Sequence, residues 1–87
     1  MRPPSRMLAV ARLILGQTQA EVAADSGISP RTIYMIEKGA AGIASVEKLV
    51  RYYSKRGVIF LAPNGAEGWG IRANFVVGYY DDERLGN

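Results

Sequence analysis

The chain has no cysteine and no histidine among its 87 residues. Without cysteine, disulfide bonds and thiolate metal sites are excluded, and without histidine an active site lacks the commonest general base and zinc ligand. The sequence also has no glycine-rich phosphate loop and no paired carboxylates that could share a pocket. We therefore expect neither an enzyme nor a bound metal or cofactor.

A long apolar run is missing too, since none approaches the roughly 20 residues that a membrane-spanning helix needs. The stretch "MRPPSRMLAVARLILGQ" has a basic start and an apolar middle, as signal peptides do. Arg12 interrupts that middle, however, and no small-residue cleavage site follows it. We expect a cytoplasmic protein without a membrane partner.

The length and the charge point to a small domain with an anionic partner. A domain of this size buries only roughly 60% of its unfolded surface, so without disulfides or metals we expect oligomerisation to support it. Residues 1–60 carry nine Lys and Arg against four Asp and Glu, a net charge of +5, whereas residues 61–87 carry two against four. A basic first part favours an anionic partner, although ordinary surface scatter is the alternative.

Periodic apolar residues between glycine and capping signals predict four helices, at residues 5–15, 18–27, 30–38 and 45–56. Ser5, Thr18 and Ser29 can cap the first three, and Glu21 completes a capping box with Thr18. Gly27 suits a left-handed turn between the second and third helices. The loop before the fourth helix is expected to hold one buried anchor, Ile43.

The character of the sequence changes after Gly57. The run "VIFLA" has the β-branched and aromatic residues of a strand, "PNGAEG" contains an Asn-Gly turn signal, and "WGIRANF" can return as a second strand. The predicted fold is mainly α, a bundle of four helices followed by a C-terminal β-hairpin. We divide the chain into a helical domain at 1–57, a hairpin and dimerisation segment at 58–80, and a disordered tail at 81–87. Residues 75–80 could add a third strand.

The third predicted helix has an unusual outer face. Ile33 and Ile36 point inward, while the outward stripe holds residues at i, i+3, i+4 and i+7 with no acid among them. These are Arg31, Tyr34, Met35 and Lys38, with Thr32 at the edge. Such a helix fits the DNA major groove, where Arg suits guanine, Thr and Met suit a thymine methyl, and Lys suits phosphate. A solvent-facing polar surface is the simpler alternative, but the order of caps, turn and stop signals favours DNA binding.

Residues 6–56 resemble the Xre-type helix-turn-helix family, which includes the lambdoid phage repressors and Cro proteins. The matching run is "QTQAEVAADSGISPRTIYMIEKG". The family pattern falls on Gln19, Ala23, Gly27, Ile33, Glu37 and Gly39. The sequence departs from that pattern at Pro30, where relatives often place a polar base-contacting side chain, and in ending on a hairpin.

The resemblance implies that residues 1–57 form a four-helix, repressor-like helix-turn-helix DNA-binding domain, in a bacterial or phage-encoded protein associated with the nucleoid. It also implies roles for particular residues. Gln19 would touch phosphate and brace the recognition helix, and Arg12 and Glu37 would form an ion pair between the first and third helices. The other implied DNA contacts are base readers (Arg31, Thr32, Met35), a groove-edge residue (Tyr34) and a phosphate contact (Lys38). Ser29 is included among the DNA-binding candidates.

The apolar residues after Gly57 indicate an interface, because exposed patches and open hairpin edges usually pair with another chain. We expect a homodimer formed through Val58, Phe60, Trp69, Ile71, Phe75 and Val77, with the hairpin folding onto its own helices as the alternative. The predicted function is a sequence-specific transcription regulator, a dimeric repressor of a near-palindromic operator that could control its own gene.

Three other partners or roles stay open at this point. An antitoxin would bind DNA and mask a toxin through its C-terminal segment, and a phage-type autoregulator would differ only in its targets. An activator would contact RNA polymerase through acids near the second helix, such as Glu21 and Asp25.

Overall fold

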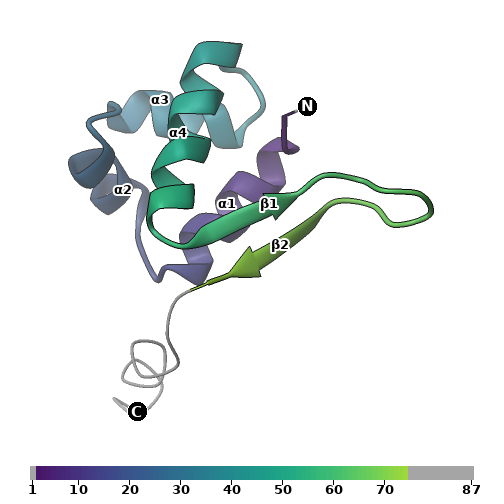
Figure 1. Cartoon of the computed structure of the whole chain (residues 1–87). Helices are drawn as coiled ribbons and strands as arrows, with labels where there is room; N and C mark the ends of the chain where they lie inside the picture. The colour runs from purple at the N-terminus through teal and green to yellow at the C-terminus, as the bar shows by residue number, and fades with distance from the viewer. Residues whose placement is uncertain (1, 75–87) are drawn as a thin grey trace.

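The computed structural model describes residues 2–74, which form four helices followed by a two-stranded antiparallel sheet (Figure 1). The elements are α1 (Ser5–Ile14), α2 (Gln19–Ser26), α3 (Pro30–Glu37), α4 (Ile43–Lys55), β1 (Val58–Leu61) and β2 (Gly70–Ala73). This confirms the predicted fold class of a helical bundle with a C-terminal hairpin. The expected third strand, the tail, and the interface residues Phe75 and Val77 lie outside the described residues.

The predicted caps of the second and third helices are present. The Thr18 hydroxyl accepts the Glu21 backbone N–H at 3.1 Å, and the Glu21 carboxylate accepts the Thr18 N–H at 2.8 Å, which completes the capping box. Ser29 accepts the Thr32 N–H at 3.1 Å, and Pro30 occupies the first turn of α3, where no amide hydrogen is needed. Between the two helices Gly27 has a φ of +78°, a conformation that other residues resist. These local signals fix where α2 ends and α3 begins.

Two of the expected helix starts are wrong. Ser5 is the first residue of α1 rather than its cap, because Pro4 occupies the cap position and supplies no side-chain hydrogen bond. Helix α4 begins at Ile43, two residues before the predicted Ser45. Ile43 is 56% exposed, so it is not the buried anchor of a loop. The core places on this side are taken instead by Val46 in α4 and by the partly buried Ala41 before it.

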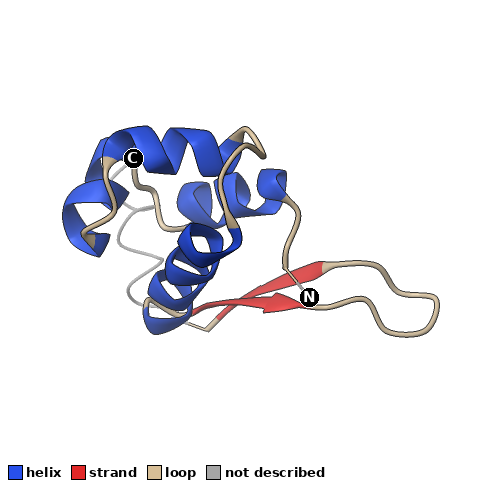
Figure 2. Cartoon of the chain, turned by 90° about the horizontal axis from the view of Figure 1, so that it is seen from above, coloured by secondary structure: helices blue, strands red, loops and turns tan. Residues whose placement is uncertain are grey.

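One apolar core joins all four helices to the first strand. Its buried members are Leu8, Ala11, Val22, Ala23, Ile28, Ile33, Ile36, Val46, Leu49, Tyr53 and Val58. Figure 2 shows the helices gathered on one side and the hairpin passing beneath them and away. The Tyr53 ring packs at 6.4 Å, centroid to centroid, against Phe60 of β1, which helps to join the sheet to α4. The hairpin therefore shares the core of the helical bundle.

The sheet pairs Val58 with Ala73 and Leu61 with Gly70. A bridge between Asn64 and Glu67 continues the same register, with two backbone hydrogen bonds of 3.0 Å each, and the chain reverses at Gly65 and Ala66. The Asn-Gly signal thus marks the turn. Val58 is fully buried within its own chain, which removes its side chain from the expected dimer interface. Phe60 and Ile71 are half-buried against the same core.

Candidate nucleic-acid interface

Helices α2 and α3 are held at a fixed angle by apolar residues on both sides of their turn. Val22 and Ala23 at the inner face of α2, Ile28 in the turn, and Ile33 and Ile36 in α3 are all at most 6% exposed. Because the turn contributes its own buried side chain, the two helices cannot rotate without opening the core. The outer surface of α3 is therefore presented by a rigid support, as recognition of a defined ligand shape requires.

The only acidic residue of α3 is turned inward. The Glu37 carboxylate accepts two hydrogen bonds from the Arg12 guanidinium, at 2.8 Å from Nε and 3.1 Å from the second amino nitrogen. A third comes from the Gln19 side-chain amide at 2.9 Å. The Glu37 side chain is 9% exposed and that of Arg12 is 17% exposed. The hydrogen bond to Glu37 raises the pKa of Arg12, so the guanidinium stays charged and α1, α2 and α3 are joined at one point.

Since Glu37 is sequestered, the outer face of α3 carries only cationic, polar and apolar groups. Arg31, Tyr34 and Lys38 are exposed, and Thr32 and Met35 are half-buried beside them. The Lys38 ammonium lies 5.3 Å from the centroid of the Tyr34 ring, a cation–π contact that orients both side chains. Arg31 has no acidic neighbour on the helix, so its guanidinium is available to an anionic or acceptor-rich ligand.

At the start of α3 the hydroxyls of Ser29 and Thr32 are hydrogen-bonded to each other. The Ser29 hydroxyl accepts the Thr32 backbone N–H and donates to Thr32 Oγ1 at 2.8 Å. Both functions of Ser29 are therefore used within the cap, which makes it a structural residue in this state. The Thr32 hydroxyl accepts from Ser29, so its own hydrogen can be donated outward. Gln19 lies across the α2–α3 pair, with its amide nitrogen on Glu37 and its carbonyl oxygen free of contacts within the described residues.

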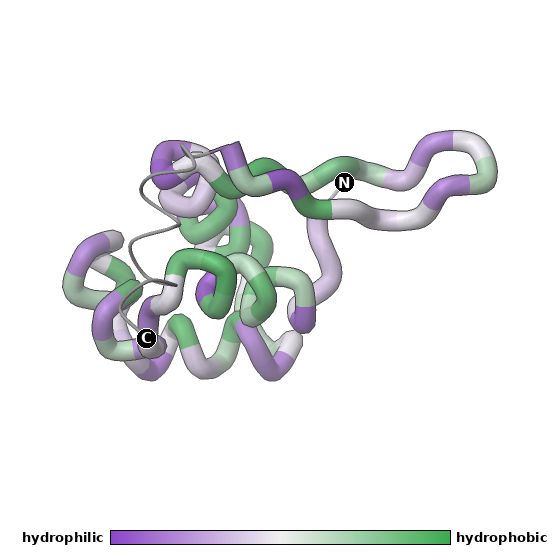
Figure 3. Tube along the Cα trace, turned by 90° about the horizontal axis from the view of Figure 1, so that it is seen from below, coloured by the Kyte–Doolittle hydropathy of each residue, from purple (hydrophilic) through white to green (hydrophobic). Residues whose placement is uncertain are grey.

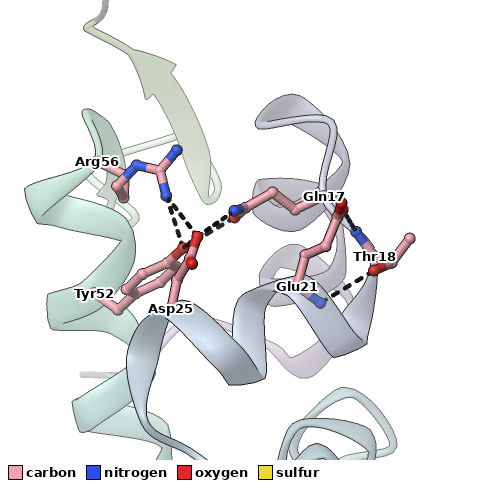
Figure 4. A network of polar contacts seen from close by, with 6 residues as sticks. All are labelled: Gln17, Thr18, Glu21, Asp25, Tyr52 and Arg56. Carbon is pink, nitrogen blue, oxygen red and sulfur yellow. Dashed lines mark hydrogen bonds and ion pairs between the residues drawn. The ribbon is translucent and has the colours of Figure 1, made fainter.

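A second polar cluster, which the sequence reading missed, holds the far end of α2 against α4 (Figure 4). The Asp25 carboxylate oxygen Oδ2 accepts from the Gln17 amide at 2.8 Å, and it lies 3.3 Å from the Tyr52 hydroxyl and 3.4 Å from the Arg56 guanidinium. Arg56 also donates to the Tyr52 hydroxyl at 2.8 Å. Asp25, considered above as a polymerase contact, is thus engaged within its own chain. Only the spacing of Tyr52 and Arg56 on one helix could have suggested part of this cluster.

Two further features bear on the kind of site. Among residues 2–74, no group of acidic, His or Cys side chains could hold a metal ion. No helix in this described part of the chain is long and apolar enough to cross a bilayer.

A capped helix, a turn with a left-handed glycine, and a second helix with a cationic outer face together define a helix-turn-helix domain of the DNA-binding type. Residues 8–54 match the family model HTH_3, described as helix-turn-helix, and this is more than half of the chain. The protein belongs to this Xre/Cro-like family of DNA-binding transcription regulators, which confirms the resemblance seen in the sequence. A comparison with curated proteins found no match.

Proposed function

We propose that the protein binds a near-palindromic operator as a twofold homodimer and represses transcription from it. In each subunit α3 enters the major groove. Arg31, Thr32 and Met35 read base edges, Tyr34 lies at the groove edge, and Lys38 contacts phosphate. Gln19 has a double role: its side-chain amide donates one hydrogen to Glu37, which braces α3, and can donate the other to the DNA backbone, together with the amino-terminal amides of α2.

The observation that supports base reading best is the placement of Glu37. An acid facing the groove would repel phosphate, yet α3 carries one only where Arg12 and Gln19 neutralise and cover it. The remaining face combines a guanidinium, an outward hydroxyl, a thioether and an ammonium. These are groups that match guanine acceptors, thymine methyls and phosphates. A face built only for phosphate would need the cations alone.

Dimerisation is supported by the apolar surface at the C-terminal end. Trp69, Phe60 and Ile71 are only half-buried in the described part of the chain, although Val58 has its place in the core. A two-stranded sheet has two open edges that can pair with another chain. In a twofold dimer the two copies of α3 would enter successive major grooves roughly 34 Å apart, and the operator would be a near-palindrome.

The test is fluorescence anisotropy on a palindrome from the region upstream of the protein's own gene, at two salt concentrations. Arg31→Ala is compared with wild type on this site and on random DNA. Lys48→Ala, which removes an exposed cation from α4, is the matched control. We expect Arg31→Ala to lose roughly 1–3 kcal/mol of preference for the palindrome, whereas Lys48→Ala keeps it. Equal binding of wild type to all sequences, governed by salt alone, would refute base reading by α3.

A further inference from the structure

The hairpin extends well beyond the sheet that anchors it. Between Leu61 and Gly70 the two segments of the hairpin leave the helices and continue side by side, as Figures 1 and 3 show. All residues from 61 to 68 are exposed, and the bridge between Asn64 and Glu67 closes the end. We name residues 61–70 the arm. Within residues 2–74, the pair Leu61–Gly70 and the bridge Asn64–Glu67 hold its two segments together.

The sheet packs on the core through one of its faces, and this face extends into the arm. Phe60 and Ile71 are paired and both pack against the core. Side chains alternate along a strand, so Ala62 and Trp69, one step further from the turn at Gly57, share that face. Ala62 is exposed and Trp69 is partly buried. The apolar face therefore continues beyond the pair Phe60 and Ile71 that packs on the core.

The composition of the arm does not suit DNA. Residues 61–71 contain Glu67 and no Lys or Arg. A β-ribbon that follows a DNA backbone needs cations to replace the counterions it releases, and an acid at its end is repelled. The arm is thus better suited to a protein surface that offers a cation near apolar groups.

Helix α1 offers such a surface on its exposed side. Arg6, Val10 and Leu13 follow at i, i+4 and i+7 and so lie on one face. Val10 is 41% and Leu13 65% exposed, although both are large apolar residues. Helix α1 contains no acidic residue, so the cation at the start of this face is not neutralised from within the helix.

The two surfaces also match in spacing. Glu67 and Trp69 are two strand residues apart, about 7 Å, and Arg6 and Val10 are four helix residues apart, about 6 Å. We propose that the arm of each subunit lies along α1 of its partner, with Glu67 facing the partner's Arg6 and Trp69 covering the partner's Val10 and Leu13. This inference rests on the proposed homodimer and assigns its contact surface. Both copies make the same contact, as a twofold interface requires.

The chain has no native cysteine, so disulfide trapping can test the contact directly. Ala62 is exposed and lies on the same face of the arm as Trp69. Purified full-length Ala62→Cys protein carrying a size tag is mixed with untagged Val10→Cys protein and oxidised. We expect a disulfide-linked heterodimer. The matched control is Lys48→Cys on α4, which should not cross-link with Ala62→Cys.

A charge exchange gives an independent readout. Glu67→Lys and Arg6→Glu should each weaken the dimer roughly tenfold in sedimentation experiments, and the double variant should recover most of that loss. Light scattering on the wild type separates the two levels of the proposal. A monomer at tens of micromolar would overturn the proposed dimer and the arm contact together. If the wild type is a dimer but Ala62→Cys links only to itself, or to nothing, the arm contact is overturned and the dimer stands.

Discussion

The contact among Arg12, Glu37 and Gln19 allows the sharpest prediction, because it stabilises the fold and shapes the DNA-binding face at the same time. Arg12→Met removes the guanidinium but keeps a long apolar side chain in its place. Glu37 would then keep only the Gln19 amide, while its side chain remains 9% exposed. Breaking a buried ion pair by removing one partner costs about 3–5 kcal/mol.

That range must be reduced here, because Arg12 is 17% exposed and Glu37 keeps a hydrogen bond. We expect Arg12→Met to lower the free energy of unfolding by about 2–3 kcal/mol. A domain of this size has a total of roughly 4–13 kcal/mol, and each 1 kcal/mol shifts Tm by roughly 4–8 °C. The expected fall in Tm is therefore roughly 8–24 °C, large enough to measure by circular dichroism.

The double variant Arg12→Met with Glu37→Met distinguishes this explanation from a simple loss of packing. Replacing both members of a buried pair by apolar residues is often neutral, so the double variant should be more stable than Arg12→Met alone. Urea unfolding of the wild type, both single variants and the double variant gives the coupling energy. Additive effects of the two substitutions would refute the view that the pair, rather than its apolar surroundings, holds α3 to α1.

Three further predictions concern the core, the second polar cluster and the turn. Within the described residues 2–74 the buried Tyr53 hydroxyl has no hydrogen-bond partner, so Tyr53→Phe should raise the free energy of unfolding by about 1 kcal/mol. Burial raises the pKa of Tyr53 above its usual value of 10.0, so the unfolded state ionises first. Stability should therefore fall as the pH rises above about 10, and less steeply in Tyr53→Phe than in the wild type. Asp25→Asn should destabilise by at most about 1 kcal/mol, since its carboxylate is 51% exposed, and high salt should reduce the difference from wild type in urea unfolding. Gly27→Ala should cost about 1–2 kcal/mol in thermal unfolding purely through its φ of +78°, because the added carbon meets nothing within 4 Å. An unchanged Tm for Gly27→Ala would contradict a strict left-handed turn.

Local signals in the sequence predicted the part of the fold that presents α3. Thr18, Ser29 and Gly27 act within three or four residues of the atoms they satisfy, so their types are enough to place the ends of α2 and α3. Ile33 and Ile36 follow from helical periodicity in the same way. The Arg12–Glu37 pair spans 25 residues and was found only through the family resemblance.

The sequence does not show which of several apolar residues will be buried in the core. Ile43 is as apolar as a buried residue, yet Ala41 and Val46 take the space and leave it at the exposed start of α4. Val58 was assigned to an interface because exposed apolar patches and open hairpin edges usually pair with another chain, but Val58 is buried in the core together with Tyr53. The Asp25 cluster joins residues up to 35 positions apart, and no periodicity marks such a contact.

Helix α1 takes part both in positioning the recognition helix α3 and in the proposed dimer contact. Its inner side carries Arg12, which holds Glu37 and so sets the position of α3. Its exposed side carries Arg6, Val10 and Leu13, where the partner's arm is proposed to bind. The path between the two copies of α3 would then run through α1 of one subunit and the paired arm of the other. Because both are hydrogen-bonded elements, packing fixes the separation of the two copies of α3. Such a dimer would accept one half-site spacing, and inserting about five base pairs, half a DNA turn, between the half-sites would reduce its affinity to that of a single half-site.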